Sequence, residues 1–209
     1  PMEFIPILEE TKMIIPVGKW VFEESVKICR EWQKKMPEFC VSVNVSYEQI
    51  KDGTFQDFVG QCTAKYGIEP RSIVLELTES SIVADWEYVN RQFDAFREQG
   101  FRIAMDDFGT GYSSLVYLKN LSCDIVKIDR EFVKNILSND FDRHIVEYTV
   151  ELCHSVGMKT CIEGVEEVEE YDLLTEICKA DSIQGYLFGH PESVPVFEKQ
   201  FLEPNVEQG

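Results

Sequence analysis

The chain has 209 residues, of which 44% are hydrophobic and 12% aromatic, a composition typical of one compact domain rather than of a disordered segment. Its formal net charge of -18 argues against a nucleic-acid polymer as partner, because phosphate backbones are bound by clustered Lys and Arg side chains. Seven scattered cysteines without a C-x-x-C pair, no signal peptide and no membrane-length apolar run predict a cytoplasmic location. A membrane anchor elsewhere in a longer parent protein is compatible with that expectation.

Short β-rich runs recur along the chain and are separated by amphipathic stretches. The predicted strands span residues 41–46, 73–77, 102–106, 125–129, 159–163 and 182–187. A helix is predicted before the first strand, over residues 20–35. Two further helices are predicted from apolar residues at helical spacing, each ended by a glycine: Trp86, Val89, Phe93 and Phe96 with Gly100, and Val146, Val150 and Cys153 with Gly157.

Strand and helix alternate at roughly 25 to 35 residues per unit, a pattern that predicts an α/β fold with parallel strands and, continued, a TIM-type (β/α) barrel. A complete barrel usually takes about 250 residues. Six strands in this chain therefore predict an incomplete barrel, with the first strands preceding Pro1. The alternative is an open doubly wound sheet. Because no linker or change of composition divides the chain, residues 1–209 are expected to form a single domain.

Polar residues follow or end the predicted strands, one strand after another: Asn44, Glu76, Asp106 and Asp107, Lys127, Glu163, and Gln184. The C-terminal ends of parallel barrel strands open on one face, where active sites of this architecture lie, so we expect these side chains to converge. Gathered carboxylates repel one another unless cations neutralise them. Ligands that are oxygen only indicate Mg²⁺ or Mn²⁺, and two such ions about 4 Å apart suit phosphodiester hydrolysis. Lys127 would place a positive charge near the phosphate or hold a water.

Each of these residues also has a simpler interpretation when it is taken alone. Glu76 could be a helix cap or a surface acid, Asn44 and Gln184 turn residues, and Lys127 a solvated charge. Their joint placement at successive strand ends favours a site. The three histidines, at positions 144, 154 and 190, are expected on helix surfaces or in loops rather than as ligands. Residues 107–109 read Asp-Phe-Gly as in kinases, but no kinase catalytic loop accompanies them.

Seven motifs occur in order along nearly the whole chain: EFIPILEET, VSVNVS, LELTES, DDFGTGYSSL, VKIDREFV, IEGVE and QGYLFGHP. In this order they resemble the EAL-domain phosphodiesterases, which hydrolyse the bacterial messenger cyclic di-GMP to linear pGpG. The resemblance implies the EAL-type TIM barrel and a place in bacterial signalling. It also implies a homodimer, and a GGDEF or sensory domain upstream in the parent protein.

The resemblance also implies roles for individual residues. The residues that match the family's ligands for two Mg²⁺ or Mn²⁺ ions, with Asp106 shared, are Asn44, Glu76, Asp106, Asp107 and Glu163. Lys127 matches the lysine that assists catalysis, Glu163 is also expected to help activate water, and Gln184 matches a glutamine lining the site. Glu79 matches a glutamate that steadies the loop after Asp107, and that loop, 108–114, is expected to link the metal site to the dimer interface.

The chain departs from the family pattern in one respect, because the E-A-L tripeptide itself does not occur in the sequence. Its glutamate, a further metal ligand, is expected before Pro1, together with an arginine and a glutamine that touch substrate. We therefore expect this chain alone to be weakly active or inactive, with its sheet edges covered by a second chain or by upstream residues. The alternatives are an inactive EAL-like domain that binds cyclic di-GMP or a protein partner, and a sugar-phosphate barrel enzyme of another kind.

Overall fold

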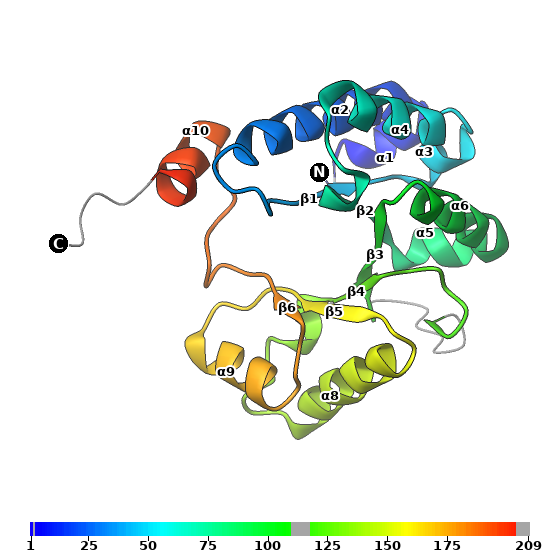
Figure 1. Cartoon of the computed structure of the whole chain (residues 1–209). Helices are drawn as coiled ribbons and strands as arrows, with labels where there is room; N and C mark the ends of the chain where they lie inside the picture. Colours follow the sequence, from blue (N-terminus) through cyan, green and yellow to red (C-terminus); the bar gives the residue numbers. More distant parts are fainter. Residues whose placement is uncertain (2, 110–117, 204–209) are drawn as a thin grey trace.

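The computed structural model describes residues 1, 3–109 and 118–203. Six parallel strands pair in chain order in one curved sheet, around which the helices lie (Figure 1). The strands are β1 (Val41–Asn44), β2 (Ile73–Thr78), β3 (Arg102–Phe108), β4 (Ile125–Ile128), β5 (Lys159–Ile162) and β6 (Ser182–Ile183). The strand order never reverses, as it would in a doubly wound sheet. The prediction of a TIM-type arrangement that forms only part of a barrel is therefore confirmed.

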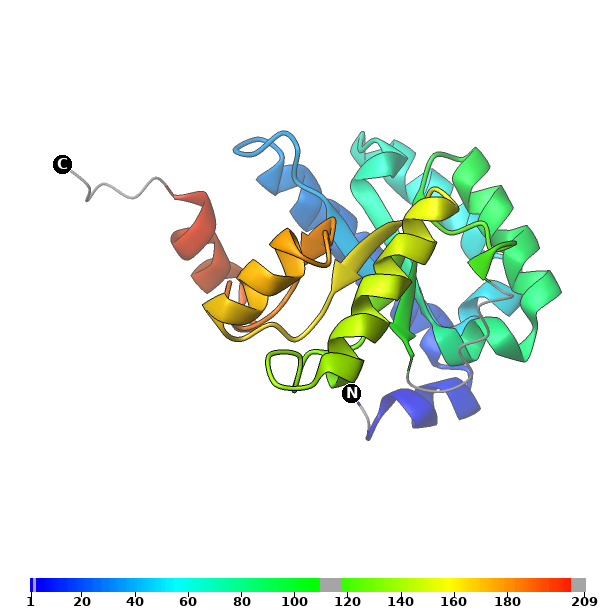
Figure 2. The same ribbon diagram turned by 90° about the horizontal axis from the view of Figure 1, so that it is seen from below.

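Most of the helices lie on the outer side of this sheet, and the C-terminal helix stands apart from it (Figures 1 and 2). The helices are α1 (Ile5–Glu10), α2 (Ile14–Trp32), α3 (Tyr47–Lys51), α4 (Phe55–Tyr66), α5 (Glu79–Ala84), α6 (Trp86–Glu98), α8 (Asp140–Ser155), α9 (Val168–Glu176) and α10 (Val194–Phe197). Short turns of 3-10 helix occur at η1 (Pro70–Ser72) and η2 (Arg130–Phe132). In the described part of the chain, no helix is both long and apolar enough to cross a membrane.

Two groups of buried side chains hold the helices on the sheet. The larger group packs α2, α4 and α6 on β1–β3. Edge-to-face aromatic contacts join these helices to one another, with the rings of Phe22 and Phe55 6.0 Å apart and those of Phe55 and Phe96 6.3 Å apart. The smaller group packs α8 and α9 on β4 and β5, and Val146 and Leu174 are fully buried in it. Burial of each such side chain contributes about 1.5–3 kcal/mol.

Helix α2 begins six residues earlier than predicted and ends at Trp32. Pro16 lies in the first turn of α2. Backbone N–H groups of a first turn have no partner within the helix, so the N–H that proline lacks is not needed and the helix can begin before it. Gly18 lies inside the helix because α3 packs closely there: a Cβ atom on Gly18 would lie 2.2 Å from the side chain of Gln49. Tertiary packing therefore explains a glycine inside a helix, where its intrinsic propensity is unfavourable.

Strand β6 contains only two of the six residues predicted for it. The chain turns at Gly185, whose backbone approaches Val165 so closely that a Cβ atom would lie 2.0 Å from the Val165 carbonyl oxygen. Beyond β6 the main chain forms hydrogen bonds with Val165: the Val165 amide donates to the Gln184 carbonyl (3.2 Å), and the Leu187 amide donates to the Val165 carbonyl (3.1 Å). The other strand predictions are correct to within two residues.

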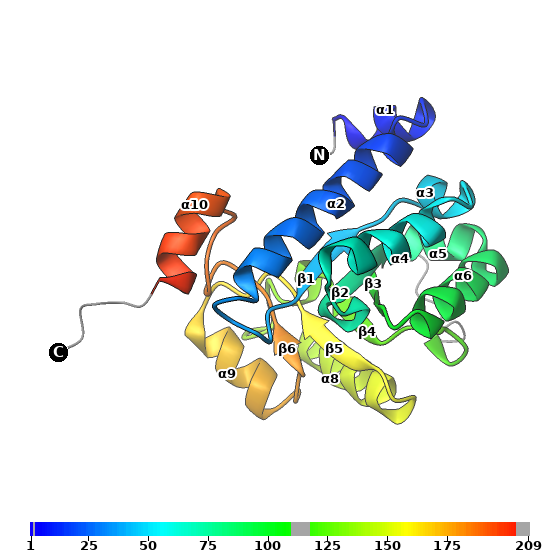
Figure 3. The ribbon, with the colours of Figure 1, turned by 45° about the horizontal axis from the view of Figure 1, so that its top comes forward.

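The C-terminal helix α10 lies against the C-terminal end of α2 (Figure 3). The rings of Trp32 and Phe197 stack with centroids 4.6 Å apart, and the Trp32 indole N–H donates to the Glu198 carboxylate at 2.8 Å. A long-range aromatic contact therefore joins the end of α2 to the C-terminal helix.

Candidate active site

Lys127 on β4 lies at the centre of a buried cluster of carboxylates. Its ammonium nitrogen is 3.0 Å from Glu76 Oε2, 2.9 Å from Asp106 Oδ1 and 2.6 Å from Glu163 Oε1. Only 6% of Lys127 and 5% of Glu76 is exposed. A buried ammonium is tolerated only when it is paired and hydrogen-bonded, and here three acids meet that requirement. The structure therefore brings four of the predicted site residues together.

The register of the sheet explains why these side chains meet. In the β2–β3 pair Glu76 lies opposite Ala104, two residues before Asp106 on the same strand. Side chains alternate between the faces of a strand, so Glu76 and Asp106 project from the same face. Glu163 directly follows β5, and its amide donates to the Ile128 carbonyl of β4 (3.0 Å), which extends the pairing by one residue.

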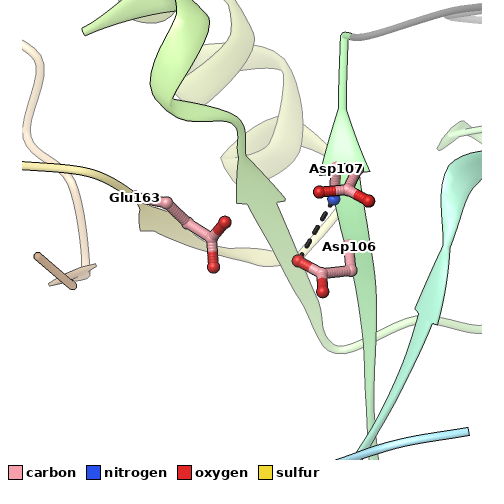
Figure 4. Close-up of side chains that lie close together, drawn as sticks. All are labelled: Asp106, Asp107 and Glu163. Atoms are coloured by element: carbon pink, nitrogen blue, oxygen red, sulfur yellow. Dashed lines mark hydrogen bonds between the residues drawn. The ribbon is translucent and has the colours of Figure 1, made fainter. Parts of the chain in front are cut away.

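A β-bulge lies at the pair Asp106–Asp107. Met105 pairs with Val126 and Phe108 with Ile128, so three steps along β3 match two along β4. Asp107 takes a positive φ of 56°, a left-handed conformation that aspartate tolerates better than most residues. In a regular strand the two neighbouring side chains would point to opposite faces. The bulge lets both carboxylates lie at the same end of the sheet, where the Asp107 amide donates to Asp106 Oδ1 at 3.1 Å (Figure 4).

The carboxylates of Asp106, Asp107 and Glu163 form a group that fits a divalent ion. Each offers an oxygen, and these three atoms lie within 4.8 Å of one another, with Glu163 reaching from β5 towards the two aspartates of β3 (Figure 4). Lys127 bonds one oxygen of Asp106 and one of Glu163, and each carboxylate has a second oxygen. A set of hard oxygen donors suits Mg²⁺ or Mn²⁺ better than Zn²⁺.

The cluster contains more carboxylates than cations, and burial raises the pKa of two of these acids. Burial, followed by the neighbouring Asp106 and Asp129, raises the pKa of Asp107. Burial also raises the pKa of Glu163, in spite of the ion pair with Lys127. For Lys127 burial alone would lower the pKa, but Glu76, Glu163 and Asp106 together outweigh burial and raise it. One ammonium therefore does not satisfy all of these acids, and an additional cation would be bound favourably.

Beside this cluster lies an open cleft of about 410 Å³, here called the acidic cleft. Its lining residues are Asp107, Asp129, Arg130, Glu163, Gly164, Glu166, Gln184, Gly185 and Tyr186. The structure thus places Gln184, an exposed residue just after β6, next to Asp107 and Glu163. Asn44 ends β1 opposite Glu76, but the structure records no hydrogen bond from its side chain to another described residue.

Glu79 begins α5 and is 95% buried, with 5% of the residue exposed. Its Oε2 accepts a hydrogen bond from the Gly109 amide at 2.9 Å. Gly109 has a φ of 103°, and a Cβ atom there would lie 2.2 Å from the Phe132 ring, so only glycine fits. Glu79 therefore holds the start of the segment that follows β3. The rest of the predicted connecting loop, 110–114, lies outside the described residues, and the role predicted for Glu79 stays a prediction.

Three charged residues of the acidic cleft were not predicted from the sequence: Asp129, Arg130 and Glu166. Asp129 lies two positions after Lys127, directly after the same strand, and this spacing was a signal that could have revealed it. Its Oδ1 accepts from the Glu131 amide (2.8 Å) and so caps η2. Arg130 and Glu166 lie in connections after the strands, where periodicity carries no information. The histidines at positions 144 and 154 lie on α8, and the third lies in a loop, as expected.

Comparisons with known proteins identify the family of this chain. The model of the EAL domain family matches residues 1–191. The chain is 32% identical over 203 residues to the signaling protein YkoW of Bacillus subtilis, covering 97% of this chain and 25% of YkoW. It is 34% identical over 194 residues to the cyclic di-GMP phosphodiesterase PdeF of Escherichia coli, covering 92% of this chain and 26% of PdeF. The chain thus spans about a quarter of the length of these curated relatives.

Solved structures show the same relationship. The PaMucR phosphodiesterase in complex with c-di-GMP superposes with a TM-score of 0.88 at 33% identity, covering 94% of this chain and 80% of that one. The EAL enzyme Bd1971 in its cAMP and cyclic-di-GMP bound form also has a TM-score of 0.88, at 32% identity, over 95% of this chain and 55% of that one. The chain belongs to the EAL domain family.

Proposed function

We propose that this chain is the catalytic domain of a metal-dependent phosphodiesterase that opens cyclic di-GMP to linear pGpG. The observation that carries the proposal is the buried group of acids around Lys127, at the C-terminal ends of β2 to β5. Homologous phosphodiesterases and an EAL structure complexed with c-di-GMP support the choice of substrate. In this proposal residues 1–209 act as a single cytoplasmic domain.

The residues that would hold two Mg²⁺ or Mn²⁺ ions are Asn44, Glu76, Asp106, Asp107 and Glu163, with Asp106 shared. Such ions, when bound, stabilise the attacking and leaving oxygens of a phosphodiester. The bulge at Asp106–Asp107 supports a shared ligand, because it turns two successive carboxylates to the same end of the sheet. The excess negative charge described above supports a demand for divalent cations.

The remaining site residues act on the carboxylates and on the water. Lys127 holds one carboxylate oxygen of each of three acids, which fixes the direction of the second oxygen of each carboxylate. Glu163 offers a second carboxylate oxygen beside the two aspartates, and this oxygen can accept a proton from the attacking water. Gln184 lines the acidic cleft, where its amide can orient a phosphate or a water. Glu79 fixes Gly109, and through it the backbone that follows the two aspartates.

The missing E-A-L tripeptide favours a second candidate function, an inactive domain that binds cyclic di-GMP or a protein partner as a signalling module. Because the E-A-L glutamate is not among residues 1–209, we also propose weak turnover for these residues taken alone. In the parent protein we propose a homodimer with a GGDEF or sensory domain upstream. A relative named as a bifunctional diguanylate cyclase/cyclic di-GMP phosphodiesterase, MucR of Pseudomonas aeruginosa, matches this chain over 28% of its length.

One experiment separates the two candidate functions. Chromatography follows the conversion of cyclic di-GMP to pGpG with Mn²⁺, and calorimetry measures binding with Ca²⁺, which is larger and coordinates more loosely. Slow turnover that requires Mn²⁺ or Mg²⁺ supports the phosphodiesterase. Binding without any metal-dependent turnover, also in a version extended upstream, supports the signalling module. A chain that neither binds nor cleaves cyclic di-GMP contradicts both.

A further inference from the structure

Arg130 is the only cationic side chain among the described residues that line the acidic cleft. Four carboxylates, those of Asp107, Asp129, Glu163 and Glu166, line the same cleft. Carboxylates repel the phosphates of a cyclic dinucleotide and can reach them only through bound cations. A phosphate oxygen that points away from the metal group would therefore be stabilised by a positively charged donor of the chain itself.

Lys127 is poorly suited to that task. Its ammonium is buried, and each of its three N–H donors can be assigned to a different carboxylate, at 2.6, 2.9 and 3.0 Å. A direct bond to phosphate would require Lys127 to release one of those acids. Arg130, by contrast, is exposed and forms no ion pair with any described residue. Its guanidinium fork is free to bind two phosphate oxygens at once.

The backbone of Arg130 is held next to the cluster by two contacts. Asp129 caps η2, the short helix that Arg130 begins, by accepting from the Glu131 amide at 2.8 Å. On the other side Gly164 packs directly on Arg130: with a φ of 75°, it would place a Cβ atom 2.3 Å from the Cβ of Arg130. Because Gly164 directly follows Glu163, Arg130 starts from a fixed position beside a proposed metal ligand.

We propose that Arg130 is a substrate-binding residue whose guanidinium binds non-bridging oxygens of a phosphate in cyclic di-GMP, at the rim of the acidic cleft. This proposal rests on the proposed function. The contact forms with the bound substrate and not only in the transition state. Its loss therefore raises KM and leaves kcat nearly unchanged.

The test compares the wild type with Arg130→Ala, Arg130→Lys and Arg143→Ala. Arg143 lies on α8, outside the cleft lining, and pairs with Asp140 at 2.6 Å, so its substitution makes the same change of net charge elsewhere. Binding of cyclic di-GMP is measured by calorimetry with Ca²⁺, and KM and kcat with Mn²⁺. Arg130→Ala is expected to weaken binding about tenfold, the scale of one lost charge-assisted hydrogen bond at an open site. Arg130→Lys is expected to recover part of the loss, because it keeps the charge without the fork.

The outcomes distinguish this proposal from the function on which it rests. Wild-type protein that binds cyclic di-GMP, together with Arg130→Ala protein that binds equally well, overturns the role of Arg130 and leaves the proposed function standing. An equal loss in Arg143→Ala also overturns it, because the effect would then be one of overall charge. Wild-type protein without any binding or turnover overturns the proposed function, and the role of Arg130 with it. A rise in KM that is confined to the Arg130 variants supports the proposal, as does a weaker dependence of their cyclic di-GMP binding on salt concentration.

Discussion

Substitution Lys127→Met tests whether the ammonium holds the carboxylate cluster together. The side chains of Lys127, Glu76, Asp106 and Glu163 are 7%, 7%, 13% and 18% exposed, so water screens their interaction only weakly. Methionine fills a similar volume but leaves three acids without their common partner. Removal of one partner from a buried ion pair costs about 3–5 kcal/mol. A change of 1 kcal/mol shifts Tm by about 2–4 °C in a domain of this size, so Tm should fall by about 10 °C without metal.

The assay is thermal unfolding followed by circular dichroism in a chelator, with Lys34→Met as the matched control. Lys34 pairs with Glu31 at 2.6 Å, but its side chain is 62% exposed, and such pairs contribute less than about 1 kcal/mol. Millimolar Mn²⁺ is expected to restore part of the loss in Lys127→Met, because it replaces the missing positive charge. A Tm within about 2 °C of the control in chelator would refute the reasoning.

Three further predictions follow from the site and the fold. Asp106→Asn is expected to lower Mn²⁺-dependent turnover at least about a hundredfold, since it removes charge that both proposed ions need. Its circular dichroism spectrum should be unchanged. Full activity would exclude the two-ion arrangement. Asp107→Asn is expected to raise the metal-free stability at pH 7 by about 1 kcal/mol in urea titrations, because asparagine tolerates the positive φ and removes a crowded charge. The raised pKa of Asp107 means that the folded state holds the proton more tightly than the unfolded state does. The contribution of Asp107 to stability therefore falls as pH rises from its unfolded pKa through its folded pKa. At pH values below both pKa values, the stability gained by Asp107→Asn should vanish. Trp32→Ala is expected to cost about 3 kcal/mol and to speed hydrogen exchange in 194–202, because the ring stacks on Phe197; unchanged exchange there would contradict that contact.

Local sequence pattern was sufficient to predict most of the elements. The short apolar runs that became β2 and β3, and the helical spacing of Val89, Phe93 and Phe96 on α6, depend on neighbours within a few residues. The rule that parallel strands end on one face then predicted that the polar residues would converge. It could not predict which of them would touch.

The contacts themselves depend on register and on close approach between distant segments, and neither is visible in periodicity. Lys127 meets Glu76 across 51 positions of sequence, because β3 lies between their strands and aligns them. The bulge that turns Asp107 towards the site, the turn at Gly185 that shortens β6, and the packing of Gly164 on Arg130 are likewise products of tertiary structure. The sequence by itself determined the elements and the order of the strand ends, since propensity and hydrophobic pattern act over a few residues. Only the folded chain decided which charges are buried together, because that depends on how strands far apart in sequence align.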